Sequence, residues 1–153
     1  MTHLPYVNSF RGLLVYQKSR ELAQNIFRLS KSFPKEEAYS LTDQIRRSSR
    51  SVGAQIAEAW GKRRYEKHFI SKLTDADGEQ QETQHWLEIA ADCEYISHQQ
   101  KAQLLNQYEE IGRLLGGMMS KADKFCKPNT HLREESPQYF TNDSSTLPLN
   151  TEN

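Results

Sequence analysis

The stretch LTDQIRRSSRSVGAQIAEA (Leu41–Ala59) carries the pattern from which the fold of the whole chain can be predicted. Its apolar and small residues recur at steps of four and three, with one pair of successive four-residue steps. This spacing keeps side chains on one face of an α-helix, so the stretch is predicted to bury a single stripe. The members of that stripe are Leu41, Ile45, Ser48, Val52, Ile56 and Ala59.

The same period recurs on both sides of this stretch, in residues 15–33, 69–90 and 104–125. No proline occurs between Pro34 and Pro128, which is typical of helices rather than of strands and turns. Four helices that each bury one stripe should pack against one another. The predicted fold class is therefore all-α, an antiparallel up-and-down four-helix bundle. Its helices are expected at about 11–32, 35–61, 64–96 and 98–127.

The ends of these segments also carry signals. Pro34 follows the first stripe and can open the second helix. Ser97, with Gln100 three residues later, predicts a capping box at the start of the fourth helix. Residues 1–9 are expected to be an N-terminal extension and residues 10–127 the single domain. Residues 128–153 hold three prolines and many Ser, Thr and Asn residues, which predicts a disordered tail.

Bulk properties exclude several classes of protein. A chain of 153 residues fits one domain. No apolar run approaches the ~20 residues of a membrane span, and the first residues lack the basic flank and apolar stretch of a signal peptide. We therefore expect a cytoplasmic protein with no membrane association. Cys93 and Cys126 lie in helical patterns without paired spacing, so both are predicted to be reduced packing thiols.

Positive charge gathers in and just after the second segment, although the chain is neutral, with 20 Lys+Arg against 20 Asp+Glu. Residues 44–67 carry seven basic and two acidic side chains. Such a patch attracts phosphate, and arginine offers planar bidentate contacts to it. The candidate nucleic-acid-binding residues are Arg46, Arg47, Arg50, Lys62, Arg63, Arg64 and Lys67.

The same cluster also has a purely structural interpretation. Asp43 lies four residues before Arg47 and Glu58 four before Lys62, an order that stabilises a helix by ~0.2–0.5 kcal/mol per pair. Residues 68–97 carry seven acidic side chains and one basic, so the third helix can neutralise the rest. A nucleic-acid face and a solvated, acid-paired face both stay open. If nucleic acid binds, we expect phosphate contacts, because aromatics are not interleaved among the arginines.

Metal binding and catalysis find little support in the sequence. Glu82 and His85 have the spacing that di-iron four-helix bundles use, but no second Glu-x-x-His follows. The chain has neither a Gly-x-Ser-x-Gly elbow nor a glycine-rich phosphate loop. We therefore predict no catalytic residues, no metal, no cofactor and no small-molecule substrate.

The third segment carries more apolar surface than one bundle core needs. Next to its core stripe runs a second apolar stripe, and a tryptophan at the end of the second segment is also off its stripe. Large apolar residues beyond one core suggest a subunit interface, although a helix buried on two sides within one monomer would look the same. The candidate oligomer-interface residues are Trp60, Trp86, Ile89, Cys93 and Ile96.

Several motifs, in order along the chain, resemble those of a known family. From about Phe10 to Cys126 the chain is similar to small bacterial four-helix-bundle proteins first noted in intervening sequences of 23S ribosomal RNA genes. The resemblance implies a left-handed bundle, a homopentamer and no enzyme activity. A relative in diversity-generating retroelements is an accessory subunit of a reverse transcriptase and binds nucleic acid. The matching motifs are VYQK (15–18), FPKEE (33–37), LTDQIRR (41–47), IAE (56–58) and YIS (95–97).

Functions of different classes follow from these observations. The first is a non-enzymatic homo-oligomeric scaffold that docks on RNA, DNA or a ribonucleoprotein through the second helix and its bend. The second is a pure protein-interaction module, for example an accessory subunit of a reverse transcriptase or another complex. The third is a metal-dependent enzyme at Glu82 and His85. Salt dependence of RNA binding separates the first two, and metal analysis addresses the third.

Overall fold

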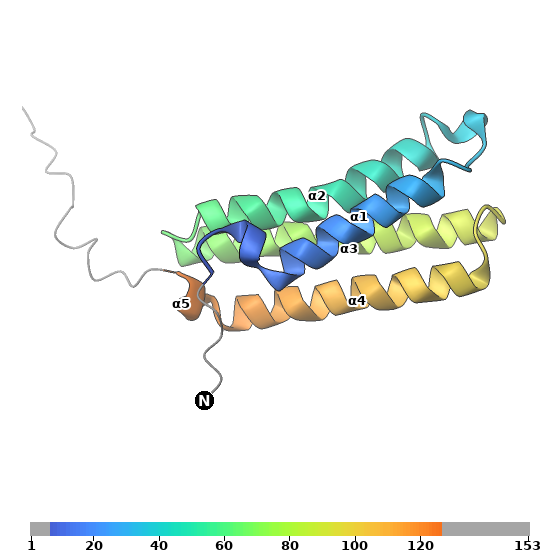
Figure 1. Cartoon of the computed structure of the whole chain (residues 1–153). Coiled ribbons are helices and arrows are strands. Elements are labelled where there is room, and N and C mark those ends of the chain that lie inside the picture. Colours follow the sequence, from blue (N-terminus) through green and yellow to red (C-terminus); the bar gives the residue numbers. More distant parts are fainter. Residues whose placement is uncertain (1–6, 127–153) are drawn as a thin grey trace, which may run out of the picture.

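The computed structural model describes residues 7–126, and every regular element in that range is a helix (Figure 1). Residues 1–6 and the predicted tail lie outside the described residues. The chain changes direction at each connection, so successive long helices run in opposite directions (Figure 1). The long helices are α1 (Leu14–Ser30), α2 (Leu41–Gly61), α3 (Glu66–Asp92) and α4 (His98–Ser120). The short ones are η1 (Phe10–Gly12), η2 (Lys35–Glu37) and α5 (Ala122–Phe125).

The core lies where the four long helices meet. Helices adjacent in sequence pack together, and α4 returns to contact α1. Every member of the stripe predicted for Leu41–Ala59 is buried, and Phe69, Leu87 and Tyr108 from α3 and α4 are fully buried beside it. Burying one large apolar side chain contributes ~1.5–3 kcal/mol, so this shared core holds the bundle together. The predicted all-α four-helix fold is confirmed.

A small polar layer crosses the core. The Ser48 and Thr83 hydroxyl oxygens lie 2.9 Å apart between α2 and α3, and both residues are buried. Ser19 of α1 is also buried and donates its hydroxyl to the Tyr16 carbonyl oxygen at 2.8 Å. Buried polar groups stabilise a packing arrangement only when they are hydrogen-bonded. This layer therefore favours one register of α2 against α3.

The predicted start of the second helix at residue 35 is wrong, because α2 begins at Leu41. Pro34 has an extended backbone (ψ 146°), and only the single turn η2 follows it. Glu37 then reaches forward: its Oε2 accepts hydrogen bonds from the Ser40 hydroxyl at 2.7 Å and the Leu41 N–H at 3.2 Å. These bonds, the first above all, lower the pKa of Glu37. A carboxylate next to a free backbone N–H stabilises the start of a helix.

The third helix is also shorter than predicted and ends at Asp92. Glu94 adopts φ 61°, and the Glu94 and Tyr95 N–H groups bond the Ala91 and Ala90 carbonyl oxygens, each at 2.9 Å. This left-handed residue with its paired backbone bonds is a common way to end a helix. The fourth helix starts as predicted, because the Ser97–Gln100 capping box is present. The remaining ends differ more: the predicted first helix is divided into η1 and α1, and the predicted fourth into α4 and α5.

Of the three glycines in α4, one lies at a close contact between helices and two do not. A Cβ at Gly116 or Gly117 would meet nothing within 4 Å in the described chain. A Cβ at Gly112 would lie 3.0 Å from the Gln80 side-chain nitrogen. Gly112 therefore permits the close approach of α4 to α3. No helix among the described residues is long and apolar enough to cross a membrane.

Candidate nucleic-acid interface

The three arginines of the predicted cluster that lie on α2 point to two different neighbouring helices. Arg46 and Arg50 lie on the side of α1, whereas Arg47 lies on the side of α3. The bend that begins at Lys62 is sixteen residues from Arg46, about 24 Å along a helix. The predicted cluster is therefore three separate groups of charges.

Arg47 is paired with the acidic third helix. Its Nη2 lies 2.6 Å from Glu82 Oε2, and its Nη1 lies 3.8 Å from Glu79 Oε1. Burial raises the pKa of Glu79, while the Arg47 charge opposes that rise. The predicted partner Asp43, one turn before Arg47, makes no ion pair with it. Arg47 thus contributes little free positive charge to the surface.

Arg46 and Arg50 form a basic patch with Lys31 of α1, and the three cations surround one aromatic ring. Arg46, Arg50 and Lys31 lie 4.9, 5.3 and 4.8 Å from the centre of the Phe27 ring. Cation–π contacts of this kind hold cations at the surface without neutralising them. Arg46 Nε also donates to the Ser30 hydroxyl oxygen at 2.7 Å. Within residues 7–126 no carboxylate forms a salt bridge with any of the three cations. We call these three cations with Phe27 the basic patch.

In the bend between α2 and α3, the basic side chains make contacts that differ from those of the basic patch. Arg63 lies over the Trp60 ring at 3.6 Å, and its Nε donates to the Trp60 carbonyl oxygen at 2.9 Å. This bond satisfies a backbone acceptor at the end of α2. Lys62 does not pair with Glu58 as expected, because Glu58 lies 2.8 Å from Lys72 of α3. That lysine is the main cause of the lowered pKa of Glu58.

The two remaining basic residues of the bend are exposed. The Arg64 guanidinium lies 5.9 Å from the Tyr65 ring centre, and Lys67 is on the first turn of α3. Neither forms a salt bridge with a carboxylate of the described chain. The bend is therefore a second positive group, at the opposite end of α2 from η2 (Figure 1). The binding role of all seven predicted residues stays a prediction.

The predicted interface stripe is only partly on the surface. Trp60, Trp86 and Ile89 are half-buried and pack against the core, and Cys93 is exposed. Ile96 is buried in the core, so it was wrongly assigned to the outer stripe. The cause is the end of α3 before Ile96, because the helical period used to place that residue does not continue that far.

The residues considered for metal binding have other contacts. Glu82 pairs with Arg47, and the exposed His85 ring packs edge-on against Trp86 with centres 4.7 Å apart. Both cysteines are free thiols: Cys126 is buried as a packing residue, whereas Cys93 is exposed. In the part of the chain that the structure describes, no group of three or more His, Cys, Asp or Glu side chains could hold a metal ion.

Sequence reasoning missed the contribution of α1 to the basic face. Phe27 and Lys31 belong to the basic patch, and Arg20 of α1 lines the same groove between α1 and α2 as Arg50. Four-residue spacing of Phe27 and Lys31 on α1, and of Arg46 and Arg50 on α2, was visible in the sequence. The sequence did not show which side of α1 packs against which side of α2.

These features define a class: a small all-helical bundle protein with a basic face formed by its first two helices. The family model of the 23S rRNA-intervening sequence protein matches residues 11–117, and the chain belongs to that family. The resemblance predicted from short motifs is thereby confirmed.

A solved structure agrees with this assignment. The chain is 36% identical to a protein of unknown function from the S23 ribosomal protein family of Bacteroides thetaiotaomicron, with a TM-score of 0.64. The match covers 70% of this chain and 96% of that one. No protein with a curated description is significantly similar to the chain.

Proposed function

We propose that this chain is a non-enzymatic, homo-oligomeric scaffold that binds RNA or DNA through the face formed by α1 and α2. The observation that carries the proposal is the basic patch, in which Arg46, Arg50 and Lys31 surround Phe27 without a carboxylate partner in the described chain. The acidic residues of α3 neutralise Arg47 and leave this patch untouched. Unneutralised arginines held at a surface are suited to phosphate.

Phosphate contact, rather than base recognition, suits the basic patch. The Phe27 ring is half-buried and three cations lie against it, so little of its face is free to stack on a base. Binding driven by phosphate neutralisation releases counterions and depends steeply on salt. The patch is therefore expected to bind many nucleic-acid sequences with similar affinity.

We further propose that the scaffold is a homopentamer. Support comes from the family resemblance and from the half-exposed Trp60, Trp86 and Ile89, which leave apolar surface outside the core. A closed ring would bury this surface repeatedly by one contact. Five copies of a weak phosphate-binding patch would then bind one nucleic acid multivalently.

Filter binding at low salt, with labelled single-stranded RNA and duplex DNA, tests the nucleic-acid function. The double variant Arg46→Gln and Arg50→Gln should lose most of the affinity. The variant Arg47→Gln is the control, because Arg47 is already paired with Glu79 and Glu82. Failure of the unmodified protein to retain either nucleic acid would overturn the proposal.

A second candidate function is a protein-interaction module, favoured by one residue. Tyr39, in the turn between η2 and α2, is 96% exposed. A fully exposed tyrosine offers a large apolar ring with a polar end, which is common at protein interfaces. If nucleic acid fails to bind at low salt while Tyr39→Ser abolishes co-purification of a cellular protein, this second function is favoured.

A further inference from the structure

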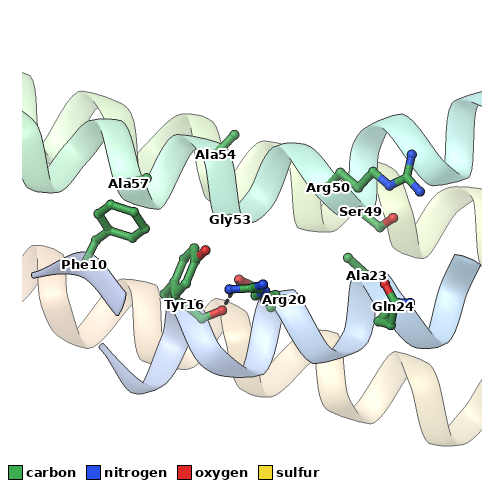
Figure 2. A pocket seen from close by; sticks show the side chains of 11 residues that line it. Phe10, Tyr16, Arg20, Ala23, Gln24, Ser49, Arg50, Gly53, Ala54 and Ala57 are labelled. Carbon is green, nitrogen blue, oxygen red and sulfur yellow. Dashed lines mark hydrogen bonds between the residues drawn. The ribbon is translucent and has the colours of Figure 1, made fainter. Parts of the chain in front are cut away.

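A groove runs between α1 and α2, next to the basic patch (Figure 2). Its volume is about 300 Å³, near the lower limit of typical small-ligand sites. Figure 2 shows Phe10 and Tyr16 towards one end and Arg50 towards the other. The two ends therefore differ in chemistry, and a ligand that fits both must also have two different parts.

Small residues of α2 line the aromatic end, and the edge of the Tyr16 ring packs against one of them. Gly53, Ala54 and Ala57 of α2 carry no large side chain, and a Cβ at Gly53 would lie 3.6 Å from the Tyr16 ring. The Phe10 and Tyr16 rings pack edge to face with centres 4.9 Å apart. The Arg11 guanidinium already lies 4.4 Å from the Phe10 ring centre, so Tyr16 is the ring that we assign to a ligand.

The other part of the groove is basic. Arg20 of α1 and Arg50 of α2 line it from opposite helices, together with Gln24. None of the lining residues is acidic, and neither guanidinium forms a salt bridge within residues 7–126. This charge favours an anionic occupant, and the forked guanidinium geometry suits phosphate oxygens.

We propose that this groove takes one nucleotide of a single-stranded nucleic acid, with its base against Tyr16 and its phosphate between Arg20 and Arg50. The inference rests on the proposed nucleic-acid function and specifies the strand that it selects. A base can stack on a side chain only when it is unpaired, so a duplex cannot use the aromatic end. Arg46 and Lys31, the other two cations of the basic patch, then supply phosphate contacts to the neighbouring nucleotides.

Fluorescence anisotropy with five competing ligands at fixed salt tests the inference. They are a single-stranded oligouridine, an abasic oligomer of equal length and charge, a duplex of equal length, and uridine monophosphate with inorganic phosphate as its reference. The oligouridine should bind at least about fivefold more tightly than the abasic oligomer, because stacking contributes to each bound base. The monophosphate should compete better than inorganic phosphate, which separates a nucleotide site from an anion site.

Matched variants locate the site. Ala54→Met fills the groove without changing charge, and Ala102→Met makes the same change on the exposed surface of α4. Arg20→Gln removes a charge from the groove, and Arg113→Gln removes one from α4. The groove variants should remove the preference for oligouridine over the abasic oligomer, whereas both α4 variants should retain it. Photocrosslinking of 4-thiouridine should label the peptide that contains Tyr16.

The possible outcomes separate this inference from the function on which it rests. If the unmodified protein binds none of the ligands at low salt, both the proposed function and the groove assignment fail. If it binds oligouridine, abasic oligomer and duplex equally, and Ala54→Met behaves like Ala102→Met, the function stands and the groove assignment fails. If Ala54→Met instead changes the mass measured by light scattering, the groove is a contact between copies of the chain and the inference is overturned.

Discussion

A positive side chain on α2 is available to a ligand only where no carboxylate of a neighbouring helix reaches it. Arg46 and Arg47 are adjacent in sequence, yet Arg47 pairs with Glu82 at 2.6 Å while Arg46 donates to the Ser30 hydroxyl. One residue along a helix turns a side chain by about 100°. This rotation directs Arg47 to a carboxylate of α3 and Arg46 to α1, so only Arg46 is available to a ligand.

The pH dependence of stability should contain a contribution from Glu79. Burial raises the pKa of Glu79 above its ordinary value of 4.5, so the folded state holds this proton more tightly than the unfolded state does. Folding is therefore weakened as pH rises from about 4.5 through the raised pKa. We expect Glu79→Gln to remove this loss and to leave the protein at least as stable at pH 7, as measured by urea unfolding at several pH values.

The matched control for Glu79 is Glu82, the other carboxylate that pairs with Arg47. Glu82→Gln removes the closer partner of Arg47 and should destabilise the fold by ~0.2–1 kcal/mol, since both side chains are partly exposed. If Glu79→Gln is the more destabilising of the two at pH 7, the assigned cause of the raised pKa is wrong.

Two glycines of α4 should respond in opposite ways to alanine. Gly116 has open space around its Cβ position, so Gly116→Ala should stabilise the protein by ~0.5–1 kcal/mol through helix propensity. At Gly112 the new Cβ would press on Gln80, whose amide nitrogen donates to Asp77 at 2.9 Å. Breaking that hydrogen bond costs about 1 kcal/mol.

Urea unfolding of both variants measures the difference. Gly112→Ala should be at least ~1 kcal/mol less stable than Gly116→Ala, because the broken hydrogen bond offsets the propensity gain. Equal stability of the two variants would show that Gln80 moves freely and that the close approach at Gly112 is not required.

At the scale of the element, the period of three and four residues predicted the existence of four long helices and their buried faces, but not all of their ends. Helix ends depend on local bonds that the period does not contain. The capping box at Ser97 was predictable because both of its partners lie within one turn. The start of α2 was not, because Glu37 bonds forward from outside the helix, and the end of α3 depends on a left-handed Glu94.

The end of α3 gives a test at this scale. Glu94 has φ 61°, a conformation that glycine adopts without the steric cost carried by other residues. Glu94→Gly should therefore stabilise the protein by ~0.5–1 kcal/mol relative to Glu94→Ala, which removes the same charge but keeps the strain. Thermal unfolding compares the two, and a lower midpoint for the glycine variant would contradict this helix-ending geometry.

At the scale of the whole molecule, the sequence identified the charges that α2 brings to the candidate site, but not the residues of α1 that join them or the way the charges are grouped. Residues 44–67 were predicted to be one basic face, whereas the bundle brings Lys31 and Phe27 of α1 beside Arg46 and Arg50. Contacts between helices depend on their relative rotation, which a period along one helix does not encode. The same limit explains why the groove between α1 and α2 was not predicted.

The proposed homopentamer is tested by light scattering at micromolar concentration. We expect a mass of five chains of 17.8 kDa each. Ile89→Gln should reduce that mass, because it places an amide in the proposed apolar contact. Leu105→Gln makes a similar change at a half-buried position of α4, outside the proposed interface, and should not. A monomeric unmodified protein would contradict the pentamer and leave the fold unaffected.

The salt dependence of single-strand binding tests the central claim most directly. Affinity for oligouridine, measured by anisotropy from about 50 to 200 mM salt, should fall linearly on a double-logarithmic plot. The Arg46→Gln and Arg50→Gln double variant should reduce that slope by about 0.7 for each phosphate that it no longer neutralises, and Arg47→Gln should leave the slope unchanged. Absence of binding at the lowest salt, or an equal reduction of the slope by Arg47→Gln, would contradict a phosphate-binding face on α1 and α2.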